Sequence, residues 1–237
     1  MPRSPGKRIL IVDDNKSIRA TVAEHLGAKG YEVLQADDGI KGLEYGLSSS
    51  ADLIILDVVM PGIDGVKLCQ LLREKGVTTP IIMLTEKAAI GDKEAGYQVG
   101  VDDYLAKPFN PRELELRIEA LQRRSASRRD APVHEKAMKL GDLEIDFTRH
   151  EVRLNGNLVP LTPIEFNILK LLASAPGRVY SRQDLLSAIW DTAYEGYKRN
   201  IDPHVNRLRT KIEGNPRRPK YILTVWGVGY KFNDSLQ

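Results

Sequence analysis

Four apolar segments that lie far apart in this chain each end on a side chain that can bind a metal ion or a phosphoryl group. They are Ile-Val-Asp13-Asp14, Ile-Ile-Leu-Asp57, Met-Leu-Thr85 and Tyr-Leu-Ala-Lys107-Pro108. Each apolar run is typical of a buried strand, and the carboxyl ends of parallel strands meet at one edge of an open α/β sheet. We therefore expect three acids, one hydroxyl and one ammonium to converge there, in a pocket suited to Mg²⁺ and to a phosphoryl group.

Between residues 7 and 124 the chain alternates apolar strand patterns with helical patterns. Five such units predict a doubly wound, five-stranded parallel sheet in an α/β domain. The expected strands are Arg8–Val12, Glu32–Ala36, Leu53–Leu56, Ile81–Leu84 and Asp103–Leu105. The expected helices lie between Asn15 and Gly30 and at Gly39–Leu47, Val66–Lys75, Ile90–Val99 and Asn110–Arg124.

A different pattern follows a polar stretch at residues 125–137, which lacks a hydrophobic period and indicates a linker. Residues 138–233 begin with alternating strands and an Asn155-Gly156 turn. Capping motifs at Thr162 and Ser181 predict two helices, and a third is expected from about Arg199 to Ile212. A glycine-turned hairpin ends the domain, and three helices followed by a hairpin describe a winged helix-turn-helix.

The charges divide the chain into an acidic and a basic part. Residues 7–124 hold 16 basic and 19 acidic side chains, whereas residues 139–237 hold 15 basic and 11 acidic ones. The basic part is therefore a candidate for nucleic-acid binding. The single cysteine, Cys69, excludes an internal disulfide, and no apolar segment is typical of a signal peptide or a membrane span. These features predict a cytoplasmic protein without a membrane partner.

The motifs and their order resemble a bacterial response regulator of the OmpR/PhoB type, in which a receiver domain precedes a winged-helix DNA-binding domain. The resemblance covers nearly the whole chain, apart from the first residues, the linker and the last few residues. It implies a two-component transcription regulator that accepts a phosphoryl group from a sensor histidine kinase, forms a homodimer and binds double-stranded promoter DNA. It also implies a protein that is not an enzyme, beyond slow self-dephosphorylation.

The resemblance assigns roles to the residues of the acidic pocket. Asp57 is the expected phosphoacceptor, and Lys107, joined to Pro108 by an expected cis peptide bond, would bind the phosphoryl group. The expected Mg²⁺ ligands are Asp13, Asp14, Asp57 and the backbone carbonyl of Val59.

Thr85 and Tyr104 are the expected switch pair, in which the hydroxyl moves to a phosphoryl oxygen and the ring turns inward. The residue after the switch threonine is usually small in this family, but here it is Glu86. A carboxylate at that position either repels incoming phosphate or points outward without effect.

Family members dimerise through charge pairs on the fourth helix, fifth strand and fifth helix of the receiver. A row of charges on a helix is usually only a solvated face, so the resemblance carries this prediction. The matching positions are Lys93, Asp102, Asp103, Glu113, Arg117 and Arg124.

The third helix of the second domain has an apolar stripe formed by Ile201, Val205, Leu208 and Ile212. We therefore expect its polar residues to face outward together, into a major groove. Asn206 and Arg207 are expected at base edges, and Arg199, Arg209 and Lys211 at phosphates. The full set of expected DNA contacts is Arg199, His204, Asn206, Arg207, Arg209, Lys211 and Trp226.

Three features of this domain depart from the family or extend it. Pro203 is tolerated only in a first helical turn, so the helix is expected to start near Ile201 or to be strained. Trp226 stands where many relatives have an arginine, which predicts a weaker preference for narrow A·T grooves. The loop from Trp190 to Tyr197 resembles a segment that contacts RNA polymerase in activators.

Two other functions compete with this interpretation. A phosphohydrolase of the haloacid-dehalogenase type also uses a strand-end aspartate, but it requires a second aspartate two residues later, where this chain has Val59. A regulator with a constitutive receiver dimer that binds DNA independently of phosphorylation stays open as an alternative, although the complete pocket argues against it.

Overall fold

The structure is a computed structural model that describes residues 7–86, 99–126, 137–190 and 200–235, with side-chain burial up to residue 122 in the second of these ranges. The chain forms two compact units, residues 1–121 and 122–237. Most of the helix predicted at Ile90–Val99 lies outside the described residues, as do Lys93 and Arg199, and so does the loop from 191 to 197.

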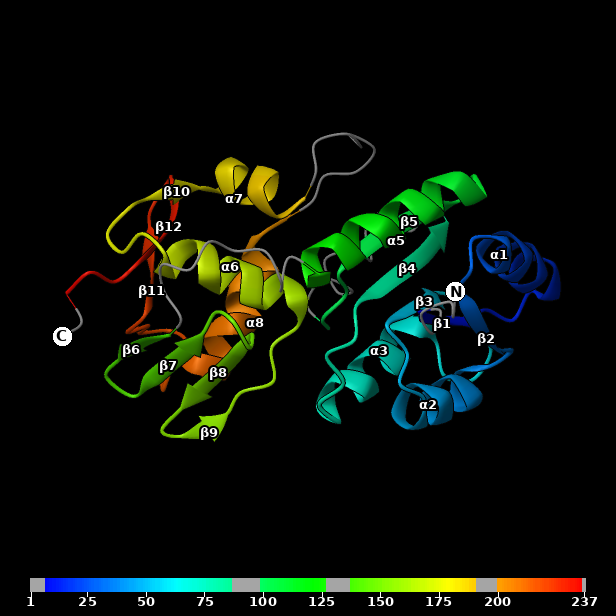
Figure 1. Ribbon diagram of the computed structural model, residues 1–237, viewed down its shortest axis with the longest axis horizontal. Coiled ribbons are helices and arrows are strands. Elements are labelled where there is room, and N and C mark those ends of the chain that lie inside the picture. The colour runs from blue at the N-terminus through cyan, green and yellow to red at the C-terminus, as the bar shows by residue number, and fades with distance from the viewer. Residues whose placement is uncertain (1–6, 87–98, 127–136, 191–199, 236–237) are drawn as a thin grey trace, which may run out of the picture. The chain divides into compact units, whose positions relative to one another are not determined.

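The first unit is built on a five-stranded parallel sheet with the strand order β2-β1-β3-β4-β5 (Figure 1). The predicted doubly wound fold is confirmed, because the chain leaves β1 toward one edge and then crosses to the other side. In such sheets, ligands bind where the strand order reverses, here between β1 and β3. The strands are β1 (Arg8–Val12), β2 (Glu32–Ala36), β3 (Leu53–Asp57), β4 (Ile81–Glu86) and β5 (Asp103–Lys107).

Helices cover both faces of this sheet (Figure 1). The helices α1 (Lys16–Ala28) and α5 (Pro111–Ala126) pack on one face, and α2 (Gly39–Ser48) and α3 (Gly65–Glu74) pack on the other. Alternate residues of each strand serve the two faces, so that Ile9 packs with α1 and α5 while Leu10 packs with α2 and α3. The strands are therefore apolar on both sides, as buried parallel strands require.

The second unit begins with a four-stranded antiparallel sheet. The Asn155-Gly156 turn joins its last two strands, with φ angles of 51° and 78° that suit this residue pair. The strands are β6 (Met138–Leu140), β7 (Leu143–Asp146), β8 (Glu151–Leu154) and β9 (Asn157–Leu158).

Three helices and a three-stranded sheet follow around one apolar core. Both predicted capping motifs are present as reciprocal hydrogen bonds at the first turns of α6 and α7. These elements are α6 (Pro163–Ala173), β10 (Tyr180–Ser181), α7 (Arg182–Ile189), α8 (Asp202–Ile212), β11 (Ile222–Val225) and β12 (Gly229–Phe232).

The start of α8 differs from the boundary first expected near Arg199. The helix begins at Asp202, so Pro203 lies in its first turn, where a missing N–H breaks no helical hydrogen bond. The expected strain at Pro203 is therefore absent from the described helix, and the alternative start near Ile201 is confirmed to within one residue.

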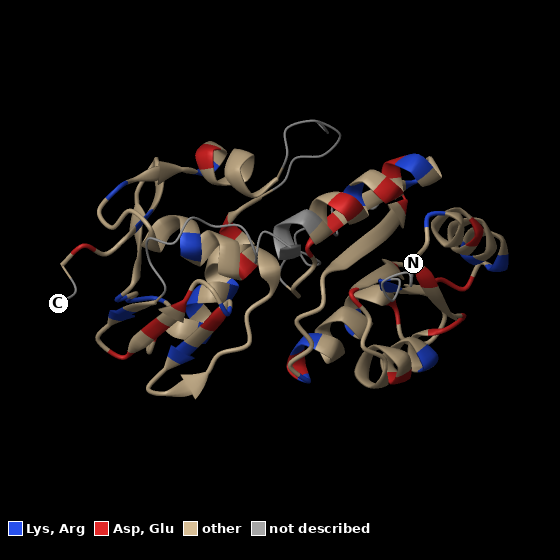
Figure 2. Cartoon of the chain, viewed as in Figure 1, with Lys and Arg blue, Asp and Glu red and all other residues tan. Residues whose placement is uncertain are grey.

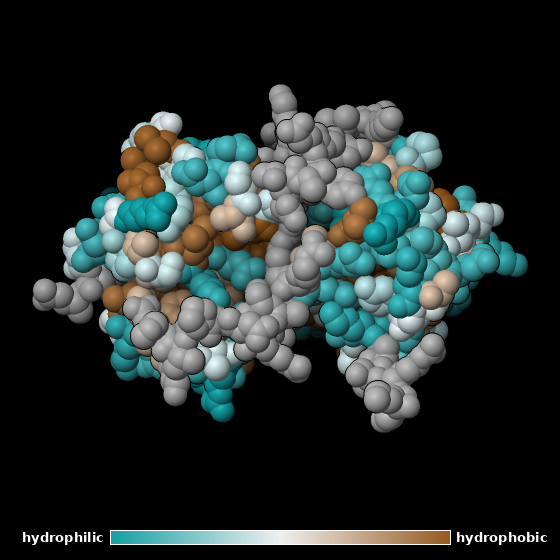
Figure 3. Space-filling model, turned by 45° about the horizontal axis from the view of Figure 1, so that its top comes forward, coloured by the Kyte–Doolittle hydropathy of each residue, from teal (hydrophilic) through white to brown (hydrophobic). Residues whose placement is uncertain are grey.

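On the face shown in Figure 3, hydrophilic residues predominate and hydrophobic residues form small separate patches. None of the described helices is long and apolar enough to cross a membrane.

Gly65 opens α3 against the backbone that carries Asp57. A Cβ atom at this position would lie 2.0 Å from the Asp57 carbonyl oxygen. We therefore expect Gly65→Ala to lower the free energy of unfolding by about 1–3 kcal/mol in urea titrations, the usual cost of overpacking. Gly27→Ala in α1 is the matched control, because nothing lies within 4 Å of its Cβ position, and it should be neutral or stabilising. Equal effects of the two substitutions would contradict the prediction.

Candidate functional site

The strand ends of the first unit bring Asp13, Asp57, Thr85 and Lys107 into one pocket. Lys107 Nζ lies 2.9 Å from Asp13 Oδ2 and 2.9 Å from Asp57 Oδ1. Both acids and the threonine are buried. The structure therefore assembles, from four different strands, the groups that the sequence places at strand ends, and the bond from Lys107 to Pro108 is cis.

Burial and charge act in opposite directions in this pocket. Burial is the largest influence on the Asp57 carboxyl and raises its pKa, and the charge of Asp13 adds to the rise, while Lys107 opposes it. Burial alone would lower the pKa of Lys107, but hydrogen bonds to both acids outweigh it, so that the pKa of the ammonium is raised. Lys107 is thus charged at neutral pH, beside a carboxylate that is suited to nucleophilic attack on phosphorus.

Three carboxylates of the pocket have a spacing that fits one metal ion. Asp13, Asp14 and Asp57 each offer an oxygen, and these atoms lie within 4.8 Å of one another. Asp14 is exposed whereas the other two are buried, so an ion held there would keep water on its open side, as Mg²⁺ prefers. The N–H of Asn15 donates to Asp13 Oδ1 at 2.8 Å and orients that ligand. The Val59 carbonyl stays a proposed ligand.

The two residues of the predicted switch pair lie on adjacent strands. Thr85 is paired in register with Ala106, and Met83 is paired with Tyr104. The Tyr104 side chain is buried in the apolar core on the side of the sheet covered by α2 and α3. The Thr85 hydroxyl donates to the Glu86 carbonyl at 3.3 Å, so it is not bound to Asp57 in this state.

Glu86 is exposed at the end of β4. It lines an open pocket of about 410 Å³ together with Lys107, Pro108 and residues of α1. Glu86 is also paired in register with Lys107, the lysine that is proposed to bind the phosphoryl group.

The charged residues proposed for a dimer face make contacts within the first unit. Arg117 bonds Asp103 at 3.0 Å and Glu113 at 2.9 Å. Asp102 bonds Arg73 at 2.9 Å and accepts from the Ile81 N–H at 2.8 Å. Acidic and basic residues alternate along α5 (Figure 2), and pairing between two copies would therefore exchange these partners. Lys93 and the side chain of Arg124 lie outside the described residues.

The outward orientation predicted for all polar residues of α8 is wrong for two of them. His204 is fully buried, and burial lowers its pKa well below the usual range. Arg209 is also buried, where its guanidinium donates to the Ile222 carbonyl and to Thr224 Oγ1 at 2.7 and 2.8 Å. Both side chains flank the apolar stripe closely enough to turn inward. The exposed face of the helix centres on Asn206 and Thr210.

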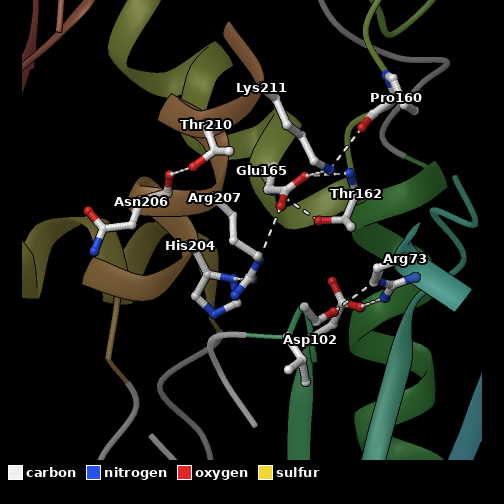
Figure 4. A network of polar contacts seen from close by, with 12 residues as sticks. Arg73, Asp102, Pro160, Thr162, Glu165, His204, Asn206, Arg207, Thr210 and Lys211 are labelled. Atoms are coloured by element: carbon white, nitrogen blue, oxygen red, sulfur yellow. Dashed lines mark hydrogen bonds and ion pairs between the residues drawn. The ribbon is translucent and has the colours of Figure 1, made fainter. Parts of the chain in front are cut away.

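Two further cations of α8 are paired with one acid of α6. Glu165 is buried, and its carboxylate accepts from Arg207 Nε at 3.2 Å and from Lys211 Nζ at 2.7 Å (Figure 4). Sequence reasoning found Glu165 only as a helix-capping residue and missed this contact. The sequence did hold a signal for this contact. Arg207 and Lys211 are four residues apart and share one side of the helix, so that a single acid can pair with both.

The wing is the hairpin formed by β11 and β12. Hydrogen bonds join it to both ends of α8, through Arg209 as described above and through Asp202. Tyr230 on β12 donates to Asp202 at 2.9 Å, and Arg182 bonds the same carboxylate at 2.9 Å. Burial and this hydrogen bond raise the pKa of Tyr230 to about 12, so the phenol stays a donor. Trp226 at the tip is 90% exposed, so it does not pack on α8.

The acid spacing makes a prediction about metal binding. Mg²⁺ should raise the unfolding temperature of the protein, since an ion bound only to the folded state stabilises it by about 1.4 kcal/mol at ten times the dissociation constant. Asp13→Asn should abolish most of this Mg²⁺-dependent increment, whereas Glu24→Gln on the exposed side of α1 should leave it unchanged. A full increment in the Asp13 variant, measured by differential scanning fluorimetry, would argue against the site.

Two family models match the chain, the response regulator receiver domain over residues 9–119 and the C-terminal domain of transcriptional regulatory proteins over residues 156–232. The chain is 40% identical to the transcriptional regulatory protein ResD of Bacillus subtilis (strain 168), over 98% of both chains. It is also 40% identical to the alkaline phosphatase synthesis transcriptional regulatory protein PhoP of the same organism, over 97% of this chain and 98% of that one.

Solved structures also match nearly the whole chain. The response regulator DrrB of Thermotoga maritima, an OmpR/PhoB homolog, matches 96% of this chain and 99% of its own, with a TM-score of 0.50 and 33% identity. A mutant of RitR covers the same shares with a TM-score of 0.76 and 26% identity. A receiver sheet with its acidic edge, a winged-helix unit and relatives that span nearly its whole length together show that the chain belongs to the OmpR/PhoB family of response regulators.

Proposed function

We propose that this chain is a phosphorylation-dependent transcription regulator that accepts a phosphoryl group on Asp57 from a sensor histidine kinase. The observation that carries the proposal is the convergence of Asp13, Asp57 and Lys107 at the sheet edge, with 2.9 Å contacts from the ammonium to both acids. Burying charges is costly, and titratable groups whose pKa values are shifted by burial and by a charged partner are concentrated at functional sites.

In the proposed transfer, a carboxylate oxygen of Asp57 attacks the phosphorus of a phosphohistidine on the kinase. A P–O bond forms as the P–N bond breaks, and the histidine nitrogen keeps the electron pair and later takes up a proton. Lys107 faces the phosphoryl oxygens, and the Thr85 hydroxyl turns from the Glu86 carbonyl to one of them. Mg²⁺, when held by Asp13, Asp14, Asp57 and the Val59 carbonyl, supplies positive charge that offsets the repulsion between carboxylates and phosphate.

Phosphorylation is proposed to act by favouring a receiver homodimer. Asp102, Asp103, Glu113 and Arg117 would exchange their present partners for those of a second copy, together with Lys93 and Arg124. Two winged-helix units would then bind tandem half-sites about 10–10.5 bp apart. Bivalent binding raises occupancy because the second contact becomes intramolecular.

The DNA-contacting surface in this proposal is the exposed face of α8 with the wing. Asn206 is exposed at its centre, Arg207 flanks it, and Trp226 projects from the wing tip. Arg209 and His204 support the helix from inside and are not retained as DNA contacts. A cytoplasmic location and a contact with RNA polymerase through the loop after α7 belong to the same proposal.

Incubation of the full-length chain with acetyl phosphate and Mg²⁺ tests the phosphorylation step. Intact mass should show one added phosphoryl group, and size-exclusion chromatography should show a shift toward dimer. Both changes should be lost in Asp57→Asn, because its amide is not a nucleophile. The control Asp52→Asn removes an acid at the opposite end of β3 and should retain both changes. Modification without a shift in size would favour the alternative of a constitutive, phosphorylation-independent regulator.

Glu86 gives a second, kinetic prediction. A charge beside the path of an anionic donor at an exposed position costs about 1 kcal/mol at 4 Å, which corresponds to about a fivefold change in rate. Glu86→Ala should therefore accelerate phosphorylation by acetyl phosphate about fivefold in low salt, and less in high salt. Glu44→Ala on α2 serves as the control for loss of an exposed acid. Equal rates for wild type and Glu86→Ala would mean that Glu86 points outward without effect.

A further inference from the structure

Glu165 lies in the first turn of α6 and connects three parts of the second unit (Figure 4). One carboxylate oxygen accepts from the Thr162 N–H at 2.9 Å and from Lys211 Nζ at 2.7 Å. The other accepts from Arg207 Nε at 3.2 Å. Since Glu165 is only 1% exposed, the two cations on α8 are fixed by a carboxylate that solvent does not reach.

The guanidinium of Arg207 is held on a second side by His204. The distance from Arg207 Nη2 to His204 Nδ1 is 2.7 Å. An arginine has only donors, so Nδ1 must be the acceptor, and the imidazole must be neutral with its proton on Nε2. Two groups, a carboxylate and an imidazole nitrogen, therefore set the plane of the guanidinium before any ligand arrives.

We propose that Glu165 is the positioning residue of the DNA-reading helix, fixing Arg207 for base recognition and holding Lys211 away from the phosphates. The inference rests on the proposed function, because it assigns Glu165 a role in selecting among DNA sequences. It extends that function to a residue of α6, which faces α8 rather than the groove.

A physical argument supports each half of the proposal. An arginine that is already ordered loses less side-chain entropy when it binds a base, and its fixed plane limits which bases it can bond. The ammonium of Lys211 lies 2.7 Å from a buried carboxylate and donates to the Pro160 carbonyl at 2.9 Å, so it is held away from the phosphates and displaces no counterion from them. Glu165 thus favours selectivity and lowers the non-specific, salt-dependent part of the affinity.

The test uses the full-length chain and duplexes that the wild-type protein selects from a random-sequence pool, with a scrambled duplex as the non-specific probe. Glu165→Gln keeps an acceptor for the Thr162 N–H but removes the negative charge. We expect the ratio of selected to scrambled affinity to fall about tenfold, which is the scale of one bidentate base contact. We also expect the slope of log affinity against log salt to steepen by about 0.9, the value for one added phosphate contact.

Two matched variants distinguish positioning from a general effect. Glu151→Gln removes one negative charge from the same unit, as Glu165→Gln does, but at an ion pair with Arg153 on β8. It should alter neither the affinity ratio nor the salt slope. In an Arg207→Ala background, Glu165→Gln should lower the ratio no further, because the side chain that it positions is missing. An independent further loss in that background would overturn the proposal.

Lys211→Met provides a test that leaves Glu165 intact, in case the glutamine variant does not fold. If Lys211 is held by Glu165, its removal leaves the salt slope unchanged. A slope that becomes shallower by about 0.9 would show Lys211 on a phosphate and overturn the proposal. If the wild-type protein selects no sequence from the pool, the proposed function itself fails. If the wild-type protein binds selectively and Glu165→Gln leaves that selectivity unaltered, the positioning role of Glu165 fails and the proposed function stands.

Discussion

The ammonium of Lys107 holds together two buried carboxylates, Asp13 and Asp57, that would otherwise repel each other across neighbouring strand ends. Three acids and one lysine leave this pocket with a formal charge of minus two, which a divalent cation would balance. The proposed phosphorylation of Asp57 would replace a single negative charge by a group with two, so the balance would be lost. The added charge must then be met by donors that are not yet engaged with Asp57, and Thr85 on β4 is the nearest candidate by register.

The paired strands β4 and β5 connect the pocket to the proposed dimer face. In the proposed switch, a movement of Thr85 toward the phosphoryl group would displace the end of β4, which is paired with β5. Tyr104 and the ion pair of Asp103 with Arg117 both lie on or against β5. A closely packed sheet has few intermediate arrangements, so a small displacement at the pocket favours one of two states. In the proposed switch, the charge imbalance at Asp57 would be converted into a change of the surface that carries the Asp103–Arg117 ion pair.

Much of this molecule could be predicted from the sequence because its signals are local. Apolar runs ending on acids gave the strands and the pocket, and capping motifs fixed the starts of α6 and α7. The orientation of the α8 side chains was harder to predict. At about 100° per residue, His204 and Arg209 each lie about 70° from the centre of the apolar stripe, so either could turn inward or outward. The direction of Arg209 depends on acceptors supplied by Ile222 and Thr224 on β11, and that of His204 on contacts with Trp190 and Arg207. No local pattern reveals the distant partners.

The buried contacts of the α8 cations limit how strongly one winged-helix unit can bind DNA. Arg209 is committed to the wing, and Arg207 and Lys211 share one buried carboxylate, so α8 presents less free positive charge than its composition suggests. The exposed centre of the helix carries Asn206 and Thr210, and the wing tip carries the uncharged Trp226. Because non-specific affinity for DNA comes mainly from neutralised phosphates, one such unit would bind weakly by itself. A weak module would make occupancy depend on joining two copies, and in the proposed function dimerisation of the receiver is the step at which phosphorylation would control DNA binding.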